Sequence, residues 1–419
     1  LSKSVELLNT ISYSVMAQYD LIYNGNVQNW VKLANSLMLR IAVRVHFIDE
    51  TLAKEYITKA LDPKNGGVIE DISSEAKIKS SDKMPLLNSM LASVNEYNET
   101  RMGATIWGYL DGYKDPRLSA YFTEGTYGSG SWAQTGYFPV APTNSKSKSE
   151  TSYSAKFASR PKVDSNSPLY WFRASETYFL KAEAALRYGI GSKSAEGYYY
   201  EGIEASFAQY GLTSAVKEYK EQNGIKWNTN GKGLTDFRCL YHADINGEGD
   251  FDNHLEQIIK QRYIADYFNG YSAWCLERRT RVLKFPPFFC NSTTEGSNGT
   301  YDFIPERYVY PLSEITNNTA AYWNAVSDLL TQSPYPINNV RKGDNLQTHL
   351  KMSLGNPLLE NADANYMNRT SRHLQKWYGN TEEEFIKNVQ KIYPDVTSSK
   401  LLRKYIGYKA TVISTYEPK

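Results

Sequence analysis

The stretch LEQIIKQRYIADYFNGYSAWCLERRT, residues 255–280, joins an amphipathic helix to a cluster of aromatic and charged side chains. The cluster consists of Trp274, Glu277, Arg278 and Arg279. A hydrolytic site that works by paired carboxylates needs a second acid, and none lies nearby in the sequence. The alternative is that Glu277 pairs with an arginine of the cluster while Trp274 packs under it, since guanidinium groups form ion pairs and also stack on aromatic rings. This alternative predicts a structural anchor whose helix lies in the core.

Hydrophobic residues recur at helical spacing in several other segments. The segment 30–45 is the most regular, because its apolar side chains follow the i, i+3, i+4, i+7 pattern throughout. Helices are predicted for residues 5–23, 30–45, 52–61, 172–189 and 195–211. The short connections after 30–45 and after 172–189 predict two antiparallel hairpins. A helix-turn-helix pair with small alanines between large aromatics is similar to a tetratricopeptide repeat.

The composition excludes some classes of function. The chain has 419 residues and a formal net charge of +2, with acidic and basic residues interspersed, which gives no electrostatic case for a nucleic-acid partner. No apolar run approaches the roughly 18 residues that a membrane-spanning helix needs. The sequence contains no HExxH, GxSxG or phosphate-loop motif. The 34 tyrosines provide flat, amphipathic rings that suit the binding of sugars or peptides, and equally the filling of cores.

Residues 103–170 are predicted to be rich in loops, because aromatics alternate with Gly and Ser in YFTEGTYGSGSWAQTGYFP and a polar run follows. A long loop inside a compact domain usually has a function. Aromatic rings stack on the apolar faces of sugars, so the candidate ligand-binding residues are Tyr121, Tyr127, Trp132, Tyr137, Phe138 and, in a second patch, Phe288. The alternative is that these rings pin the loop to the body of the protein or contact a partner.

An acidic segment at 244–252 resembles part of a calcium-binding EF-hand loop. Its candidate oxygen ligands are Asp244, Asn246, Glu248, Asp250 and Asp252. The pattern breaks at the twelfth place, where Leu255 stands and an EF-hand needs a bidentate glutamate. An EF-hand is therefore excluded, while a looser Ca²⁺ site and a solvated acidic turn both stay open. No cofactor is expected to be required.

Five separated stretches carry a family resemblance. They are WVKLANSLMLRIAVR at 30–44, DPRLSAYF at 115–122, RASETYFLKAEA at 173–184, IIKQRYIADYFNGYSAWCLERRT at 258–280 and IPERYVYPLSE at 304–314. In this order they resemble the SusD/RagB family of nutrient-binding outer-membrane lipoproteins, and the first stretch is similar to the branch called SusD-like type 2. The resemblance runs from about residue 20 to about residue 318.

The resemblance implies a mostly α-helical fold, in which tetratricopeptide-like helical hairpins form a scaffold for an irregular, loop-rich, ligand-binding part. We expect a single SusD-like domain over residues 1–419. Its parts are tetratricopeptide-like helices at about 4–62 and 172–211, a loop-rich region at about 103–170, an anchor helix at about 255–274 and a loop-rich C-terminal part at about 281–419. Family members begin with a signal peptide, a lipidated cysteine and further repeat helices, so we expect this chain to be N-terminally incomplete.

The resemblance also implies a function. Family members lie on the extracellular face of the outer membrane, held by an N-terminal lipid anchor that this chain does not contain. They form a lid over a SusC-like TonB-dependent transporter, capture an oligosaccharide or polysaccharide, and deliver it to the transporter. The same role with an oligopeptide ligand is the alternative. A glycosidase that uses Glu277, or a structural subunit that binds no nutrient, are further alternatives, and we expect no enzyme activity.

Overall fold

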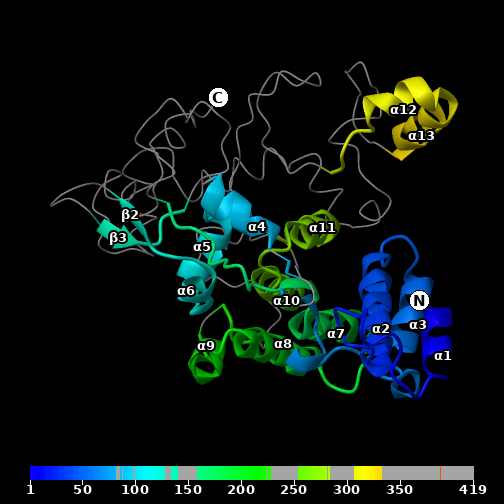
Figure 1. Cartoon of the computed structure of the whole chain (residues 1–419), viewed down its shortest axis with the longest axis horizontal. Helices are drawn as coiled ribbons and strands as arrows, with labels where there is room; N and C mark the ends of the chain where they lie inside the picture. The colour runs from blue at the N-terminus through cyan, green and yellow to red at the C-terminus, as the bar shows by residue number, and fades with distance from the viewer. Residues whose placement is uncertain are drawn as a thin grey trace.

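Helices dominate the computed structural model, as the hydrophobic spacing predicts (Figure 1). The structure describes residues 1–81, 85–86, 88–97, 100–127, 134–139, 158–222, 224–227, 253–280, 282–283, 306–332 and 387. Within these residues the strands form small antiparallel pairs, β1 (Ala76–Ile78) with β4 (Leu169–Phe172) and β2 (Gly125–Tyr127) with β3 (Gln134–Gly136). The predicted mostly α-helical fold class is therefore confirmed.

The N-terminal helices pack side by side, with α2 in contact with both of its neighbours. They are α1 (Ser2–Leu8), α2 (Val27–Arg44) and α3 (Glu50–Leu61). The side chain of Asn26 begins α2 by accepting a hydrogen bond from the Asn29 backbone N–H at 3.1 Å. Asp49 begins α3 in the same way, with the Leu52 N–H at 2.9 Å. Such caps satisfy backbone donors that a helix leaves unpaired at its first turn, so the predicted hairpin at 30–61 has local as well as tertiary support.

The helix predicted for residues 5–23 is wrong beyond Leu8, where α1 ends. Asp20 organises the turns that follow, because its carboxylate accepts hydrogen bonds from Trp30 Nε1 at 2.7 Å and from three backbone N–H groups of the next turn at 2.8–3.1 Å. Gly25 completes this turn at a φ of +80°, a backbone conformation that glycine adopts readily and that residues with a side chain disfavour. The hydrogen bonds to Asp20 thus stabilise turns where apolar spacing alone predicts a helix.

The second hairpin consists of α7 (Ala174–Tyr188) and α8 (Ala195–Gln209). Gly189 ends α7 at a φ of +65°, and the side chain of Ser194 begins α8 by accepting from the Gly197 N–H at 3.1 Å. At Gly202 a Cβ would lie 2.7 Å from Phe179 Cε1, so the missing side chain allows the two helices to approach closely. The predicted pair at 172–211 is confirmed.

The anchor helix predicted at 255–274 is in fact two helices, α10 (Asn253–Ala265) and α11 (Gly270–Thr280). The chain turns between them at 266–269, where Phe268 adopts a φ of +74°. Asn269 begins α11, because its Oδ1 accepts a hydrogen bond from the Ser272 N–H at 3.1 Å. An aromatic residue at positive φ is incompatible with a continuing helix, and this explains why the prediction of one helix is wrong. We call residues 266–269 the corner.

Helix α7 lies between two hydrophobic clusters and contributes to both. Phe179 and Ala182 belong to the cluster that includes residues of α8, α10 and α5 (Ala104–Gly112). Leu180 and Ala184 belong to the cluster that α2 and α3 form with Phe172 at the end of β4. Helix α10 packs against α7 in the first cluster, and α2 packs against α7 in the second. Helix α7 therefore fixes the position of α2 relative to α10 (Figure 1).

The region predicted to be loop-rich, 103–170, contains the regular elements α5, α6 (Arg117–Tyr121), β2 and β3. A buried network holds it in place. Arg117 is fully buried and donates to both oxygens of Asp115 at 3.0 and 2.6 Å, to Ser206 Oγ at 2.9 Å and to Gln261 Oε1 at 2.9 Å. A buried guanidinium is tolerated only when its donors are paired. The network therefore ties this region, with the regular elements it contains, to α8 and α10.

Short segments complete the described residues. They are η1 (Pro63–Asn65), η2 (Ile72–Ser74), α4 (Ser89–Leu91), η3 (Ala92–Glu96), η7 (Thr213–Ala215), α9 (Val216–Lys220), α12 (Leu312–Asn317) and α13 (Thr319–Gln332). The last two, drawn in yellow in Figure 1, lie in the part predicted to be loop-rich, so that prediction is wrong for residues 312–332. Among the helices described, none is long and apolar enough to cross a membrane.

Candidate functional site

The charged end of α11 is anchored to α7 by a buried ion pair. Arg279 donates two hydrogen bonds to the Glu183 carboxylate of α7, at 2.5 and 2.7 Å, and both side chains are 1% exposed. Arg187 reaches the same carboxylate at 2.9 Å. Burial alone would raise the pKa of Glu183, but Arg279 and Arg187 lower it well below the ordinary range. The pairing arginine is therefore supplied by the predicted cluster, while its carboxylate comes from another helix.

The other members of the cluster also hold neighbouring segments. The Arg278 guanidinium lies over the Trp274 ring at 3.8 Å and donates to the backbone oxygen of Glu306. Glu277 is 2% exposed, and its carboxylate accepts a hydrogen bond from the Leu283 N–H at 2.9 Å. The predicted packing of Trp274 against an arginine is confirmed. These contacts fix the segments that follow α11 against the helix.

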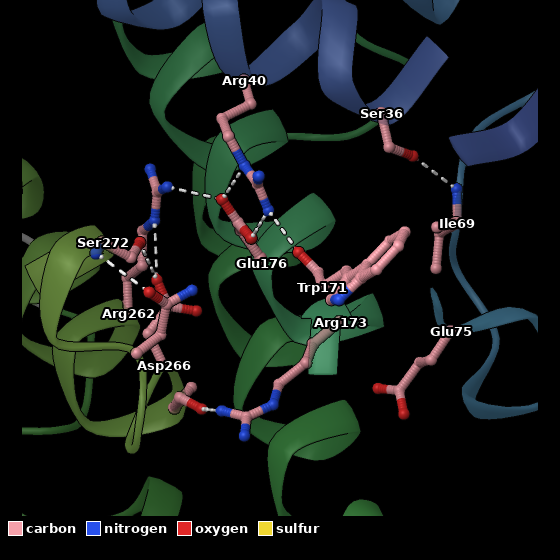
Figure 2. Close-up of polar contacts among 12 residues, drawn as sticks. Ser36, Arg40, Ile69, Glu75, Trp171, Arg173, Glu176, Arg262, Asp266 and Ser272 are labelled. Carbon is pink, nitrogen blue, oxygen red and sulfur yellow. Dashed lines mark hydrogen bonds and ion pairs between the residues drawn. The ribbon is translucent and has the colours of Figure 1, made fainter. Parts of the chain in front are cut away.

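A second buried charge network positions the corner. Glu176 of α7 accepts hydrogen bonds from Arg40 of α2 at 2.7 and 2.6 Å and from Arg262 of α10 at 2.8 Å (Figure 2). Burial favours the neutral acid, but the two guanidiniums lower the pKa of Glu176 to about 2. Arg262 also lies 3.6 Å from Asp266, the first residue of the corner, which accepts from Ser272 Oγ at 2.9 Å. The corner is thus tied to α2 and α7 through paired charges.

On the outer side of this anchor, aromatic rings reach solvent. Tyr271 is 71% exposed, Tyr308 is 67% exposed and Phe268 is 39% exposed. Trp274 packs against Tyr308 with ring centroids 5.2 Å apart and an interplanar angle of 73°. A hydrogen bond with Tyr271 raises the pKa of the Tyr308 hydroxyl, so this phenol is neutral at physiological pH. The segment 266–280 therefore places its charged side chains in the core and the rings of Phe268 and Tyr271 at the surface.

A pocket of about 660 Å³ opens beside these rings, and we call it the corner pocket. Its wall combines aromatic side chains with a smaller number of polar ones, and includes Thr100, Arg101, Tyr263, Phe268, Tyr271, Trp274 and Tyr308. Small-molecule sites usually measure about 300–1,000 Å³ and have this mixture of lining groups. Asp266 also lines the pocket, but its carboxylate is engaged by Arg262 and Ser272. The arrangement is suited to stacking on a ligand rather than to acid–base chemistry.

A comparison with protein families identifies the chain. The family model described as Susd and RagB outer membrane lipoprotein matches residues 1–350. The chain belongs to the SusD-like family. Members of the SusD-like family are binding proteins rather than enzymes, and the family description places them at the outer membrane. The resemblance drawn from the five sequence stretches is therefore confirmed. A comparison with curated proteins gives no match.

Solved structures of SusD-like proteins share the fold. BT1043 is 61% identical, with a TM-score of 0.69 over 84% of this chain and 69% of BT1043. A SusD homolog (BT1281) from Bacteroides thetaiotaomicron is 26% identical, with a TM-score of 0.69 over 84% of this chain and 71% of the homolog. A chitin-binding SusD homolog from Flavobacterium johnsoniae is 26% identical, with a TM-score of 0.66 over 84% of this chain and 69% of that protein. The fold of the described residues is thus that of the SusD-like family.

The aromatic residues predicted to bind ligand do not gather in the corner pocket of this SusD-like chain. Tyr121 is 1% exposed, donates its hydroxyl to the Ile264 carbonyl at 3.0 Å and stacks on Tyr267 with centroids 4.4 Å apart. Phe138 is 7% exposed, and Tyr137 is half-buried, which raises the pKa of its hydroxyl. The backbone of Tyr127 belongs to β2, while Trp132 and Phe288 lie outside the described residues. Burial of Phe138 is consistent with the alternative in which such rings pin the segment to the body. Tyr121, although buried, lies in the wall of a second pocket of about 360 Å³.

The candidate calcium ligands cannot be placed. Asp244, Asn246, Glu248, Asp250 and Asp252 all lie outside the described residues. Among the residues that are described, no group of three or more His, Cys, Asp or Glu side chains is arranged to hold a metal ion. The Ca²⁺ site stays a prediction from sequence.

The rings of the corner pocket were missed by sequence reasoning, although a signal was present. The dipeptide Asn269-Gly270 interrupts the helical pattern and is a strong turn signal. A turn at this point would have placed Phe268 and Tyr271 on a protruding corner instead of along a buried helix face. The contribution of Tyr308 had no such signal, because it joins the pocket from a distant part of the sequence.

Proposed function

We propose that this SusD-like protein captures an oligosaccharide or polysaccharide at the cell surface. Held by a lipid anchor, it then delivers the glycan, as a lid, to a partner TonB-dependent transporter of the SusC type. The observation that carries the proposal is the corner pocket, where exposed aromatic rings lie beside a buried anchor that the Arg279–Glu183 pair holds. Family membership supports the transporter partner and the surface location.

The pocket has the physical properties that glycan binding needs. A pyranose ring has apolar C–H faces and a hydroxylated edge, so it stacks on flat rings while its hydroxyls bind polar groups at the wall. Tyr271 and Trp274 lie on the rigid helix α11, which lowers the entropic cost of ordering them around a ligand. The Flavobacterium johnsoniae homolog, 26% identical to this chain, is a chitin-binding protein, and this similarity supports a glycan as the ligand here as well.

An oligopeptide is the second candidate ligand, because the same aromatic faces accept apolar peptide side chains. Hydrolysis of the ligand is disfavoured by the position of Glu277. A general acid must reach the glycosidic oxygen, whereas the Glu277 carboxylate is buried and accepts from the Leu283 N–H. Burial of Glu277 therefore supports a binding function over a glycosidase.

Affinity electrophoresis on a panel of polysaccharides tests the proposal. We expect retardation by at least one glycan, and a loss of most of that retardation in Tyr271→Ala. Tyr13→Ala is the matched control, since Tyr13 is also 71% exposed and does not line the corner pocket. Absence of retardation across the panel, together with peptides found by native mass spectrometry of the purified protein, would replace glycan by peptide as the ligand.

A further inference from the structure

A second pocket lies on the other side of the corner. It measures about 360 Å³, and its wall includes residues of α6, the segment 162–168, β4, the start of α7, the end of α8 and the corner. Trp171, Arg173, Gln209 and Tyr210 line this pocket and not the corner pocket, whereas residues 266–269 line both. We call it the Trp171 pocket. The two pockets are therefore neighbours that share the corner as a common wall.

The walls of the Trp171 pocket are held by the buried charge network. Arg40, which pairs with Glu176, also donates to the Trp171 carbonyl at 3.1 Å (Figure 2). On the opposite wall, Arg173 donates to the carbonyls of Ala265 and Tyr267 at 2.7 and 2.9 Å. These bonds fix the strand that carries Trp171 and the corner relative to one another. The pocket is thus preorganised, which reduces the cost of binding.

The charged groups in this wall are already engaged with the protein. Glu176 is paired with two arginines and Asp266 with Arg262 and Ser272. Arg173 and Lys162 donate to backbone carbonyls. The wall holds two carboxylates, Glu176 and Asp266, and two cations, Arg173 and Lys162, so it has no net charge that would attract a charged ligand. The wall therefore favours an uncharged ligand that bonds through hydroxyl groups and stacks on an aromatic face.

Aromatic rings stand where such a ligand would stack. Trp171 is 48% exposed and Phe268, in the shared wall, is 39% exposed. Phe268 keeps its backbone in the left-handed conformation, at a φ of +74°, although its ring is not buried. Strained residues of this kind cluster at binding sites, where the surrounding structure holds them. Here Phe268 lines both pockets, with Trp171 exposed in one and Tyr271 and Tyr308 exposed in the other.

We propose that the Trp171 pocket and the corner pocket are two subsites of one glycan site, which binds a neutral oligosaccharide across the Phe268 ring. The inference rests on the proposed function and adds to it the length and charge of the ligand. A short oligosaccharide fills only the corner pocket. A longer one extends over Phe268 and places a further sugar residue against Trp171.

Titration calorimetry with a length series of neutral oligosaccharides tests this arrangement. In the wild type, affinity rises with length and then levels off. Trp171→Ala binds the shortest members like the wild type but loses about tenfold affinity for the longest ones, a loss of the size that an aromatic stacking contact supplies. Tyr271→Ala weakens the binding of every member. Trp323→Ala is the matched control, because Trp323 of α13 is 44% exposed and lines neither pocket.

A further variant, Phe268→Gly, separates an effect on ligand binding from an effect on protein stability. Glycine accepts the positive φ, so the variant keeps or raises the thermal midpoint while it weakens the binding of long oligosaccharides. Equal binding of long members by the wild type and Trp171→Ala would overturn the two-subsite arrangement and leave the proposed function standing. Tighter binding of a uronate-terminated series would overturn the neutral ligand class. If the wild type binds neither oligosaccharides nor any polysaccharide, the proposed function fails and this inference fails with it.

Discussion

Replacing Glu183 by glutamine tests the anchor that holds α11 against α7. In the wild type, one carboxylate neutralises Arg279 through two hydrogen bonds at 2.5 and 2.7 Å and also binds Arg187 at 2.9 Å. Glutamine keeps the shape and one acceptor oxygen, but its amide donors face guanidinium donors and the buried charge of Arg279 loses the carboxylate that neutralises it in the wild type. Removing one partner of a buried pair costs about 3–5 kcal/mol. That is a large share of the roughly 5–15 kcal/mol by which a folded domain is typically stable.

Urea unfolding measures this loss, with Glu50→Gln as the control. Glu50 forms an exposed pair with Lys54 at 2.7 Å on α3, with both side chains at least half exposed, and solvent screening leaves such a pair with little effect on stability. A double variant, Glu183→Leu with Arg279→Met, should be more stable than Glu183→Gln, because it leaves no unpaired guanidinium at position 279. The reasoning is refuted if Glu183→Gln loses no more stability than Glu50→Gln.

The pH dependence of this loss has a defined sign. The pKa of Glu183 in the folded protein lies well below its unfolded value of about 4.3. The stabilisation by Glu183 is therefore fully present above that value and is lost as the pH falls through the lowered pKa. The difference between the wild type and Glu183→Gln should accordingly shrink in acid and stay constant between about pH 6 and pH 8, measured by the same urea titration at each pH.

Three further outcomes follow from the structure. Glu277→Ala removes the acceptor of the Leu283 N–H and should lower the free energy of unfolding by about 1–3 kcal/mol while glycan affinity stays unchanged. Lost affinity at an unchanged thermal midpoint would show that the anchor interpretation is wrong. Gly202→Ala places a Cβ 2.7 Å from the Phe179 ring and should cost about 1–3 kcal/mol in urea unfolding, and a neutral result would mean that α7 and α8 separate without cost. Glu176 has a folded pKa of about 2, so its contribution is present above about pH 4.3 and is lost as the pH falls towards 2; Glu176→Gln should remove that acid-dependent part of the stability profile.

The helical scaffold was predictable where local and tertiary signals agree. In α2, α7 and α8 the apolar spacing matches the buried face, and capping residues such as Asn26 and Ser194 stand where the helices begin. The prediction is wrong where side chains override the spacing. Asp20 stabilises turns inside an apolar pattern, and Phe268 at positive φ divides the helix that the sequence suggests.

The candidate site was less predictable, because its residues come together from distant parts of the chain. Arg101, Tyr271 and Tyr308 line one pocket, and no spacing rule connects them. Tyr121 stands in an aromatic segment that suggests a binding surface, yet it is buried and its hydroxyl bonds to Ile264. An aromatic ring serves a core and a ligand site equally well. Sequence therefore identified the family, while the position of the exposed rings and the partner of Arg279 required the structure.

Hydroxyl-radical footprinting of the protein with and without a bound glycan tests most directly whether the corner pocket is the ligand site. Tyr271 and Tyr308 are 71% and 67% exposed, and Tyr13 and Tyr19, which lie outside the pocket, are exposed to the same degree at 71% and 68%. We expect saturating glycan to protect Tyr271 and Tyr308 from oxidation while Tyr13 and Tyr19 react at unchanged rates. Protection of Tyr13 and Tyr19 with Tyr271 and Tyr308 still fully reactive would contradict a glycan site at the corner.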